Sequence, residues 1–579
     1  MSSRFLCLVG GPVQQHAAMA GFVQARLGLG AGLTLGPTTF FFADTTEVAR
    51  NDEVDAIVIG SLYRRCGDSK ASSLSPTEWR GLTQSQGRSL LASRWGSWIS
   101  CTWDGASRVL SVLRDPSGAA PCYYRTDGVM SVMSSNVRDL ERIGSLQPAI
   151  NWDVVADLLM RPAHRGAATG IAGVSEVLPG CMLRLRPDEG YAETQVVWTP
   201  WNFVSEVARD PHPAAMLEAL IDDVTEKMAR SSERAVLSLS GGLDSSLVAA
   251  ALQRTGRQTD CLTMMTGDGE GDETRFAAMV ARGLGFPLVS CRYDLDKVDL
   301  GYSAARHLPR PTARSFAQGA DKLRNAYAKE HGADLIFAGD GGDNVFCFLQ
   351  SVLPVLDRLQ AQGPSKGLFA TIRDMSMLSR SSMFTVLHRA VRRRLRGEGY
   401  RWPVNSRFLT VRSIARSAAV IGHPWLDAPP GAALGKAAHV AMLVRSQLYH
   451  EAREPGAADV RLPLLAQPLV EYCLRIPTWK WCEGGHNRVM AREAYAGRLP
   501  AQVLRRRTKG GADAFCVALV DANLGLIREM LLDGLLARQG LIQTDAIAAS
   551  LDNPVRSGGD THRLLALVDA EAWARSWIT

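Results

Sequence analysis

The stretch Ala235–Leu252 reads AVLSLSGGLDSSLVAAAL, and it decides the fold of the second half of this chain. The apolar run Ala235–Leu239 predicts a buried strand, and the alanine-rich series from Leu243 predicts a helix. Between them lies a short turn in which two adjacent glycines let the backbone come close to a ligand. The pattern therefore predicts strand, tight turn and helix in immediate succession.

The turn has the chemistry of a phosphate site. An anion would accept hydrogen bonds here from the free N–H groups at the helix start and from the hydroxyls of Ser240, Ser245 and Ser246. It is not a Walker A loop, because no Gly-Lys-Ser/Thr follows. Asp244 would repel a phosphate unless a divalent cation lay between them, so we predict that Asp244 is a magnesium ligand. An ordinary turn of small residues is the alternative.

The full motif SGGLDSS resembles the pyrophosphate loop of ATP pyrophosphatases, which adenylate a carboxylate or carbonyl-type oxygen and release pyrophosphate. The resemblance implies ATP as the co-substrate, Mg²⁺ as the cofactor and an α/β domain with a parallel sheet of the PP-loop type. It assigns nucleotide binding to Ser240, Gly241, Gly242, Asp244, Ser245 and Ser246.

Composition narrows the class of protein. The chain has 579 residues, which is too long for one core, so two domains are expected. A net charge of +7 is mild over this length and does not demand nucleic acid as a partner. Eleven cysteines without a CxxC pair argue against a zinc cluster and favour the reducing cytoplasm. We expect no membrane-spanning segment, because no run approaches eighteen apolar residues.

Residues 1–205 are expected to form a β-rich domain, because short apolar runs alternate with clusters of turn residues. The stretch Trp95–Ser135 resembles the glutaminase domain of asparagine synthetases, an Ntn-hydrolase-like α+β sandwich. The proline-containing segment 200–214 marks a boundary. We expect residues 206–579 to form an asparagine synthetase-like ATP pyrophosphatase domain, helical in its last third.

Two departures predict that the glutaminase-like domain is degenerate. That family uses an amino-terminal cysteine, whereas removal of Met1 here would expose Ser2. Serine serves as an amino-terminal nucleophile in other enzymes, so the sequence leaves open whether Ser2 retains any activity. Ile59 replaces an asparagine whose amide would stabilise an oxyanion, and losing one such donor costs about 10²–10³ in rate. We expect the domain to be a scaffold that packs on the synthetase domain.

A second glycine-rich acidic turn, GDGGDN, follows the apolar run Leu335–Ala338. Alternating strands and helices imply a parallel sheet with right-handed crossovers, in which this strand can lie beside the first. Loops at neighbouring carboxyl ends form the ligand crevice, so Asp343 would face Asp244. A shared Mg²⁺ would offset their repulsion. A free-standing acidic turn is the alternative.

Three further residues are assigned by resemblance. Gly339 belongs to the nucleotide site, and Asp340 stands where asparagine synthetases carry glutamate and β-lactam synthetases carry a tyrosine of a catalytic dyad. Asp340 is a general base or positions the amine, or it only braces the loop. The tail 459–511 resembles that of asparagine synthetases, and this resemblance makes Lys509 the lysine that stabilises the triphosphate and the tetrahedral intermediate.

Three segments differ from asparagine synthetases and resemble lasso peptide cyclases: GDGGDNVFCFLQSVLPVLDRL at 339–359, PLLAQPLVE at 463–471 and CLRIPTWKWCEGGHNR at 473–488. The resemblance implies ATP-dependent macrolactam formation in a lasso precursor peptide. An Asp or Glu side chain is adenylated, and the peptide's amino-terminal amine displaces AMP. The implied partners are the core peptide, a leader peptidase and a leader-recognition protein, with neither nucleic acid nor membrane.

Three other functions stay open. A glutamine-independent asparagine or β-lactam synthetase-like ligase would use a small substrate, and the altered tail segments count against it. A PP-loop tRNA-modifying enzyme would bring an RNA-binding module or a cysteine constellation, and neither is visible. A silent scaffold is disfavoured by the presence of Asp244, Asp343 and Lys509.

The basic run RAVRRRLRGEGYRW at 389–402 is either a solvated helix face or a docking site for an acidic peptide or phosphates.

Overall fold

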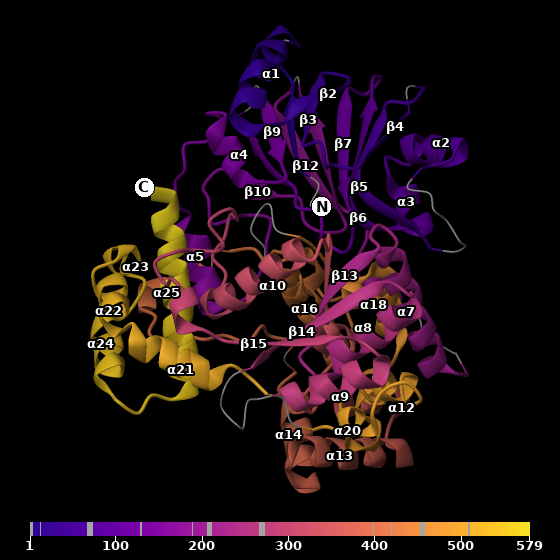
Figure 1. Ribbon diagram of the computed structural model, residues 1–579, viewed down its shortest axis with the longest axis vertical. Helices are drawn as coiled ribbons and strands as arrows, with labels where there is room; N and C mark the ends of the chain where they lie inside the picture. Colours follow the sequence, from indigo (N-terminus) through magenta and orange to yellow (C-terminus); the bar gives the residue numbers. More distant parts are fainter. Residues whose placement is uncertain are drawn as a thin grey trace.

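The computed structural model describes residues 4–11, 13–51, 53–65, 73–127, 130–187, 189–204, 211–265, 273–397, 399–418, 420–451, 458–507 and 510–578. Ser2 and Lys509 lie outside these ranges, so their roles stay predictions. The chain forms two parts, with the amino-terminal part at the top of Figure 1 and the larger carboxyl-terminal part below it.

Two six-stranded antiparallel sheets make the centre of the amino-terminal part, in the orders β10-β8-β9-β1-β3-β2 and β12-β11-β7-β6-β5-β4. The strands are β1 (Phe5–Val9), β2 (Gly30–Leu35), β3 (Thr38–Phe42), β4 (Val48–Asn51), β5 (Ala56–Arg64), β6 (Arg94–Asp104), β7 (Val109–Arg114), β8 (Tyr123–Thr126), β9 (Ser131–Ser134), β10 (Ser175–Glu176), β11 (Cys181–Arg186) and β12 (Tyr191–Val196).

Helices cover the outer faces of both sheets, which gives four layers: helix, sheet, sheet, helix. The helices of this part are α1 (Val13–Leu27), α2 (Pro76–Gln84), α3 (Arg88–Ser93), α4 (Val137–Arg142) and α5 (Trp152–Met160). The first half of β5 is apolar because both of its faces are buried: Ile57 and Ile59 fill the core between the sheets, whereas Val58 lies under α2 and α3. This is the predicted Ntn-type α+β sandwich.

The carboxyl-terminal part contains a five-stranded parallel sheet in the order β15-β14-β13-β16-β17. Its strands are β13 (Arg234–Ser238), β14 (Gln258–Met265), β15 (Leu288–Arg292), β16 (Leu335–Ala338) and β17 (Asp459–Arg461). The predicted neighbourhood of the two motif-bearing strands is confirmed, because β13 and β16 pair directly with Ala235 opposite Leu335 and Ser238 opposite Ala338.

Both faces of this sheet are covered, as expected of parallel strands. Leu237 and Phe337 face α8 (Leu243–Arg254), whereas Val236 and Ile336 face α10 (Gln318–Glu330). The helices α7 (Pro213–Ala229) and α9 (Thr274–Leu284) pack beside α8. The α/β prediction for this part, with its parallel sheet, is therefore confirmed.

The rest of the chain is mainly helical. Its helices are α6 (Trp201–Val204), α11 (Gly342–Val345), α12 (Leu353–Gln362), α13 (Lys366–Ser379), α14 (Met383–Leu395), α15 (Val411–Ser417), α16 (Leu434–Ser446), α17 (Leu448–Glu451), α18 (Gln467–Arg475), α19 (Val489–Ala494), α20 (Ala501–Leu504), α21 (Asp513–Ala522), α22 (Leu524–Leu532), α23 (Leu535–Arg538), α24 (Thr544–Asp552) and α25 (Gly558–Ile578). Among the described residues, none of these helices is long and apolar enough to span a membrane.

The two parts share a hydrophobic core. Val137 of α4 and Val155 of α5 belong to the same buried cluster as Leu564, Leu567 and Trp573 of α25. In Figure 1 the last helix, drawn in yellow, rises to this junction. The amino-terminal part therefore packs firmly on the remainder of the chain.

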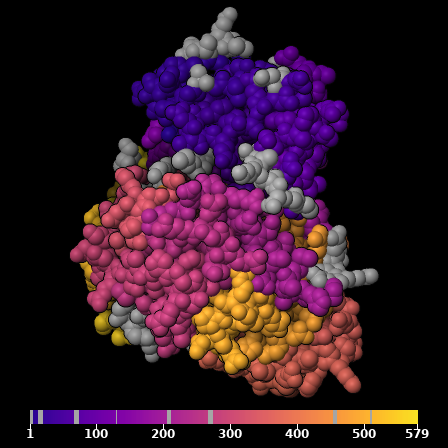
Figure 2. All heavy atoms as spheres, turned by 45° about the vertical axis from the view of Figure 1, so that its right-hand side comes forward, coloured from indigo at the N-terminus to yellow at the C-terminus, as the bar shows by residue number. Residues whose placement is uncertain are grey.

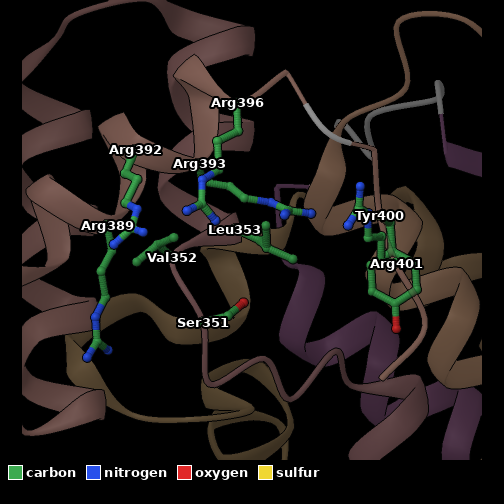
Figure 3. Close-up of a pocket in the computed structure, with 9 residues that line it drawn as sticks. All are labelled: Ser351, Val352, Leu353, Arg389, Arg392, Arg393, Arg396, Tyr400 and Arg401. Atoms are coloured by element: carbon green, nitrogen blue, oxygen red, sulfur yellow. The ribbon is translucent and has the colours of Figure 1, made fainter. Parts of the chain in front are cut away.

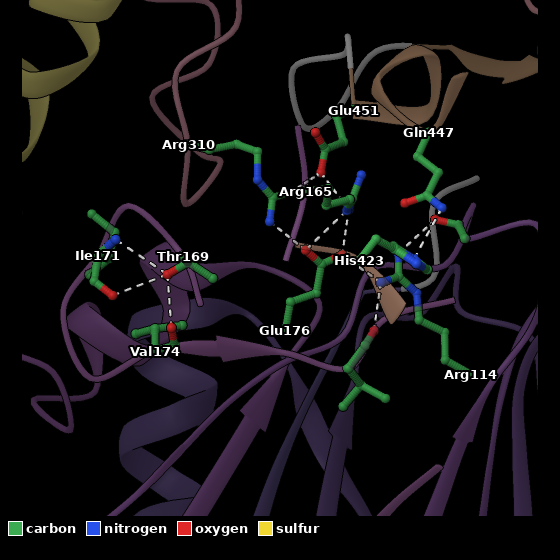
Figure 4. A network of polar contacts seen from close by, with 12 residues as sticks. Arg114, Arg165, Thr169, Ile171, Val174, Glu176, Arg310, His423, Gln447 and Glu451 are labelled. Carbon is green, nitrogen blue, oxygen red and sulfur yellow. Dashed lines mark hydrogen bonds and ion pairs between the residues drawn. The ribbon is translucent and has the colours of Figure 1, made fainter. Parts of the chain in front are cut away.

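Buried charges also join the two parts, as Figure 4 shows. Glu176 of β10 accepts hydrogen bonds from Arg114 at 2.6 Å and from Arg165 and Arg310. Glu451 of α17 accepts from Arg165 at 2.8 Å and from Arg310. Burial by itself would raise the pKa of Glu176, but the three guanidinium groups outweigh burial and lower it. This network of three arginines and two glutamates is completed only when the parts meet.

Asp569 of α25 gives the fold a pH dependence. Its buried carboxylate accepts hydrogen bonds from the backbone nitrogen of Ser315 at 3.3 Å and from its hydroxyl at 3.1 Å. Burial raises the pKa of Asp569 to about 7. Because the folded chain holds this proton more tightly than the unfolded chain, the group favours folding at low pH. That contribution is lost as pH rises through the folded pKa.

We expect Asp569→Asn, which keeps the shape but cannot ionise, to gain stability relative to the parent as the pH rises from about 4 to about 7. Urea denaturation across this range measures the difference in free energy of unfolding. The exposed Asp533 supplies the matched control, Asp533→Asn. Parallel stability curves for parent and Asp569→Asn would contradict the assignment.

Candidate functional site

The loop between β13 and α8 is held by its own hydroxyls. The Ser246 hydroxyl donates to the carbonyl of Gly242 at 2.7 Å, and the backbone N–H of Gly242 donates to the Ser240 hydroxyl at 3.2 Å. The hydroxyls of Ser240 and Ser245 lie 3.1 Å apart. The loop is therefore shaped before any ligand arrives, with backbone N–H groups at the start of α8.

Gly241 is required by the packing of this loop. Its φ is +77°, and an added Cβ would lie 2.5 Å from the backbone nitrogen of Ala277 and 2.9 Å from the carbonyl oxygen of Glu273. Both contacts are with the start of α9. Only glycine fits this close approach, so the loop is wedged against a second helix start.

Gly339 sets the contact between the two motif-bearing turns. It follows β16, and an added Cβ would lie 2.4 Å from the backbone nitrogen of Ser245 and 2.6 Å from the carbonyl carbon of Asp244. The end of β16 therefore touches the first turn of α8. This close approach brings the second turn, with Asp340 and Asp343, alongside the first.

Replacing Gly339 with alanine tests this contact. We expect Gly339→Ala to lower the free energy of unfolding by about 1–3 kcal/mol, because backbone atoms of α8 would have to move. Chemical denaturation measures the loss. A matched control is Gly525→Ala in α22, where an added Cβ meets nothing within 4 Å. Equal stability of the two variants would contradict the wedged geometry.

Asp244 and Asp343 lie together, joined by one arginine. Arg488 Nη1 is 2.8 Å from each carboxylate oxygen of Asp244 and 2.5 Å from Oδ1 of Asp343. Arg488 precedes α19 with a left-handed φ of +50°, and its guanidinium lies 5.2 Å from the ring centre of Phe348. The sequence predicted that the two carboxylates face each other, but it did not single out Arg488.

The pair also fits a divalent cation. The two carboxylates already converge on one positively charged nitrogen, which is the arrangement that a shared Mg²⁺ needs. Among the described residues, no group of three or more His, Cys, Asp and Glu could hold a metal. Mg²⁺ commonly binds through one or two carboxylates together with phosphate oxygens and water, so two carboxylates fit its usual ligand set.

More cationic groups surround this pair. Burial, with Arg488 and Arg507 nearby, lowers the pKa of Arg492 to about 10. Burial and the same arginine neighbourhood also lower the pKa of His486. Arg488, Arg492 and Arg507 therefore lie near one another beside the loop, and a cluster of guanidinium groups suits a triphosphate.

The residues before and after Lys509 both contact Glu273, which lies beside the loop between β13 and α8. Arg506 Nη2 lies 2.7 Å from Oε1 of Glu273, and the backbone nitrogen of Gly510 donates to the same oxygen at 2.7 Å. Glu273 is the residue whose carbonyl the Gly241 loop packs against. The residues flanking Lys509 thus lie at the edge of the loop, and Glu273 and Arg506 join Arg488 as site residues that the sequence did not single out.

Asp340 lines a cavity that is separate from the Asp244–Asp343 pair. A cavity of about 90 Å³ opens at the carboxyl end of β16. It is lined by Asp340 together with Tyr302, Arg314, Gln318, Asp321, Arg324, Tyr449 and others. One wall is fixed by Arg324, whose guanidinium donates to the Ser238 hydroxyl at 3.0 Å. Asp340 is therefore set beside the nucleotide loop but lines a separate cavity.

The four-layer sandwich and the parallel sheet with its glycine-serine loop define an ATP-dependent amide ligase with an Ntn-type amidotransferase domain. Residues 215–577 match the family model described as asparagine synthase, and residues 73–198 match that of the glutamine amidotransferase domain. The chain belongs to the asparagine synthase family.

Two solved structures show some likeness to parts of this chain. Glutamine phosphoribosylpyrophosphate amidotransferase from B. subtilis, complexed with ADP and GMP, aligns with 50% of this chain and 81% of its own, at 8% identity and a TM-score of 0.22. The NH3-dependent NAD synthetase from Campylobacter jejuni aligns with 32% of this chain and 97% of its own, at 14% identity and a TM-score of 0.19. No curated protein matches the chain.

Proposed function

We propose that this chain forms the isopeptide bond of a lasso precursor peptide, using ATP to activate an Asp or Glu side chain. The observation that carries the ATP chemistry is the convergence of Asp244 and Asp343 on one cationic group beside the Ser240–Ser246 loop. The choice of a peptide substrate is supported by the three segments that resemble lasso peptide cyclases.

In the first step the peptide carboxylate oxygen bonds to the α-phosphorus, and the bond from that phosphorus to pyrophosphate breaks. The N–H groups of the Gly241-Gly242 turn and the loop hydroxyls would bind the departing phosphates. Asp244 and Asp343 would hold Mg²⁺, which neutralises negative charge on the triphosphate when bound. Arg488 and Lys509 would add positive charge on the same side.

In the second step the amino-terminal nitrogen attacks the activated acyl carbon, and the bond to AMP breaks. An α-amino group has a pKa of about 7.7–8, so a useful fraction is neutral near pH 7. Asp340 would accept the proton that the amine loses, since it faces the cavity next to the loop. Holding the two ends of one peptide in place is worth roughly 7–11 kcal/mol, so placement supplies most of the catalysis.

The amino-terminal domain would be a scaffold. Ile59 is fully buried between the two sheets, so an apolar side chain packs where the related glutaminases carry a polar donor. The shared core with α25 and the buried charges around Glu176 give this domain a structural reason to be kept.

A small-substrate amide ligase is the second candidate. The cavity beside Asp340 measures only about 90 Å³, which suits a small molecule better than a folded peptide. Such an enzyme would use the same Asp244 and Asp343 for ATP, so the substrate alone distinguishes the two candidates.

Mass spectrometry distinguishes the peptide cyclase from the small-substrate amide ligase. The full chain is incubated with Mg²⁺, ATP and a synthetic candidate core peptide that has a free amino terminus and an Asp or Glu acceptor. We expect a product lighter by one water and one AMP released per product. The same peptide with its amine acetylated, or with Asn or Gln at the acceptor position, is the control. ATP turnover with free aspartate and ammonia, without peptide, would overturn the proposal.

A further inference from the structure

Helix α14 lies at the end of the molecule farthest from the amino-terminal part (Figures 1 and 2). It presents an apolar stripe to solvent. Its Val386 and Ala390 are buried in a small core with α12 and α13. On the opposite side Phe384, Leu387, Val391 and Leu395 are exposed, with Phe384 78% and Leu395 82% accessible. The spacing of these four side chains places them in one row along the helix.

A basic pocket of about 510 Å³ lies beside the stripe. Figure 3 shows Arg389, Arg392, Arg393 and Arg396 of α14 on one side, with Tyr400 and Arg401 on the other. Ser351, Val352 and Leu353 lie between the two walls. The pocket thus combines guanidinium groups with an aromatic ring and an apolar floor.

The described residues offer several of these arginines no carboxylate partner. Across the part of the chain that the structure describes, no Asp or Glu forms an ion pair with Arg389, Arg392 or Arg396. Arginines gathered on one helix repel one another, and each guanidinium suits a bidentate carboxylate. The pocket is therefore complementary to a ligand that brings several negative charges.

We propose that α14 and this pocket bind an acidic amphipathic peptide segment of another polypeptide. Carboxylates of the segment would pair with Arg389, Arg392 and Arg396, while its apolar side chains would cover Phe384 and Leu395. Protein interfaces are enriched in arginine and aromatic residues and bury an apolar centre inside a charged rim. This binding surface lies apart from Asp244 and Asp343, so it stands whether or not the proposed cyclase activity is correct.

The shape of the surface favours a peptide over other polyanions. A lipid headgroup layer is nearly flat and would leave the pocket over Val352 and Leu353 unfilled, although a basic amphipathic helix resembles membrane-surface helices. A nucleic acid backbone would pair with the arginines but has nothing apolar to cover the stripe. An amphipathic peptide with acidic side chains on one face and apolar side chains on the other satisfies both features.

Fluorescence anisotropy with the full chain tests the proposal. The probe is a labelled synthetic peptide with glutamate and leucine at helical spacing, and its partner has glutamine in place of every glutamate. We expect the glutamine peptide to bind about tenfold more weakly or worse, and the affinity of the acidic peptide to fall with added salt. The double variant Arg392→Glu/Arg396→Glu should lose about tenfold or more in affinity for the acidic peptide.

Two further variants complete the test. Arg26→Glu/Arg80→Glu makes the same charge change on exposed arginines of the amino-terminal part and should keep the parent affinity. Leu395→Ser removes part of the stripe without a change in charge and should weaken binding of the acidic peptide. The proposal would be overturned if the two peptides bound equally well, or if both arginine double variants lost affinity equally. It would also be overturned if anionic phosphatidylserine vesicles or duplex RNA bound and the acidic peptide did not.

Discussion

Replacing Asp343 with asparagine is expected to reduce ATP-dependent AMP release by about 10³-fold or more. Asparagine has nearly the same shape but no charge, so the carboxylate pair with Asp244 is reduced to one anion. A cation shared by the pair then loses one ligand, and the triphosphate loses neutralisation. Asp244→Asn should have the same effect, since both carboxylates converge on the same position, which Arg488 Nη1 contacts. Chromatographic quantification of AMP at saturating peptide measures the loss.

A direct metal readout accompanies this measurement. Electron paramagnetic resonance of Mn²⁺ in the presence of ATP should show weaker binding in both variants than in the parent. Asp427→Asn changes an exposed carboxylate away from the loop and serves as the matched control. Unchanged Mn²⁺ binding together with unchanged AMP release in Asp343→Asn would remove the shared-cation assignment.

The sequence revealed the parts of the site that depend on local pattern. The run before Ser240 is apolar and the series after Gly242 is rich in alanine, and β13 and α8 form where these two segments predict a strand and a helix. The position of β16 beside β13 followed from the handedness of crossovers. Each of these features can be predicted from residues that are close in the sequence or from a general rule of chain topology.

Arg488 is a site residue that local sequence patterns do not predict. It lies 244 residues beyond Asp244 in a tail with many arginines, and nothing in its local sequence marks it as the partner of two carboxylates. The left-handed backbone that aims its side chain is a property of the folded tail, because arginine does not favour a positive φ. The same holds for Glu273 and Arg506, which meet only after the tail has folded back.

The charges between the two parts were also invisible in the sequence. Glu176 and Arg310 are 134 residues apart, and Arg165 and Glu451 are 286 residues apart. Charged residues are usually solvated, so composition predicts a surface role for each of them. Their burial is tolerable because Arg165 and Arg310 each pair with both Glu176 and Glu451 in the folded chain.

Glu176→Gln is therefore expected to lower the free energy of unfolding by about 3–5 kcal/mol. Glutamine keeps the volume, but it leaves Arg114, Arg165 and Arg310 buried with one carboxylate fewer, and uncompensated buried charge is costly. Because the network lies between the two parts, we also expect the amino-terminal part to separate first, which would give two transitions in urea. Glu193→Gln on the exposed strand β12 provides the matched control.

The direction of the pKa shift adds a second test of the same network. The three arginines hold the pKa of Glu176 below its usual value. Its stabilising contribution is therefore present above the unfolded pKa and is lost only as the pH falls through the lower folded pKa. The difference in stability between the parent and Glu176→Gln should accordingly persist at about pH 5. A difference that vanished there, or a variant as stable as Glu193→Gln, would mean that the arginines are neutralised elsewhere and that Glu176 does not join the two parts.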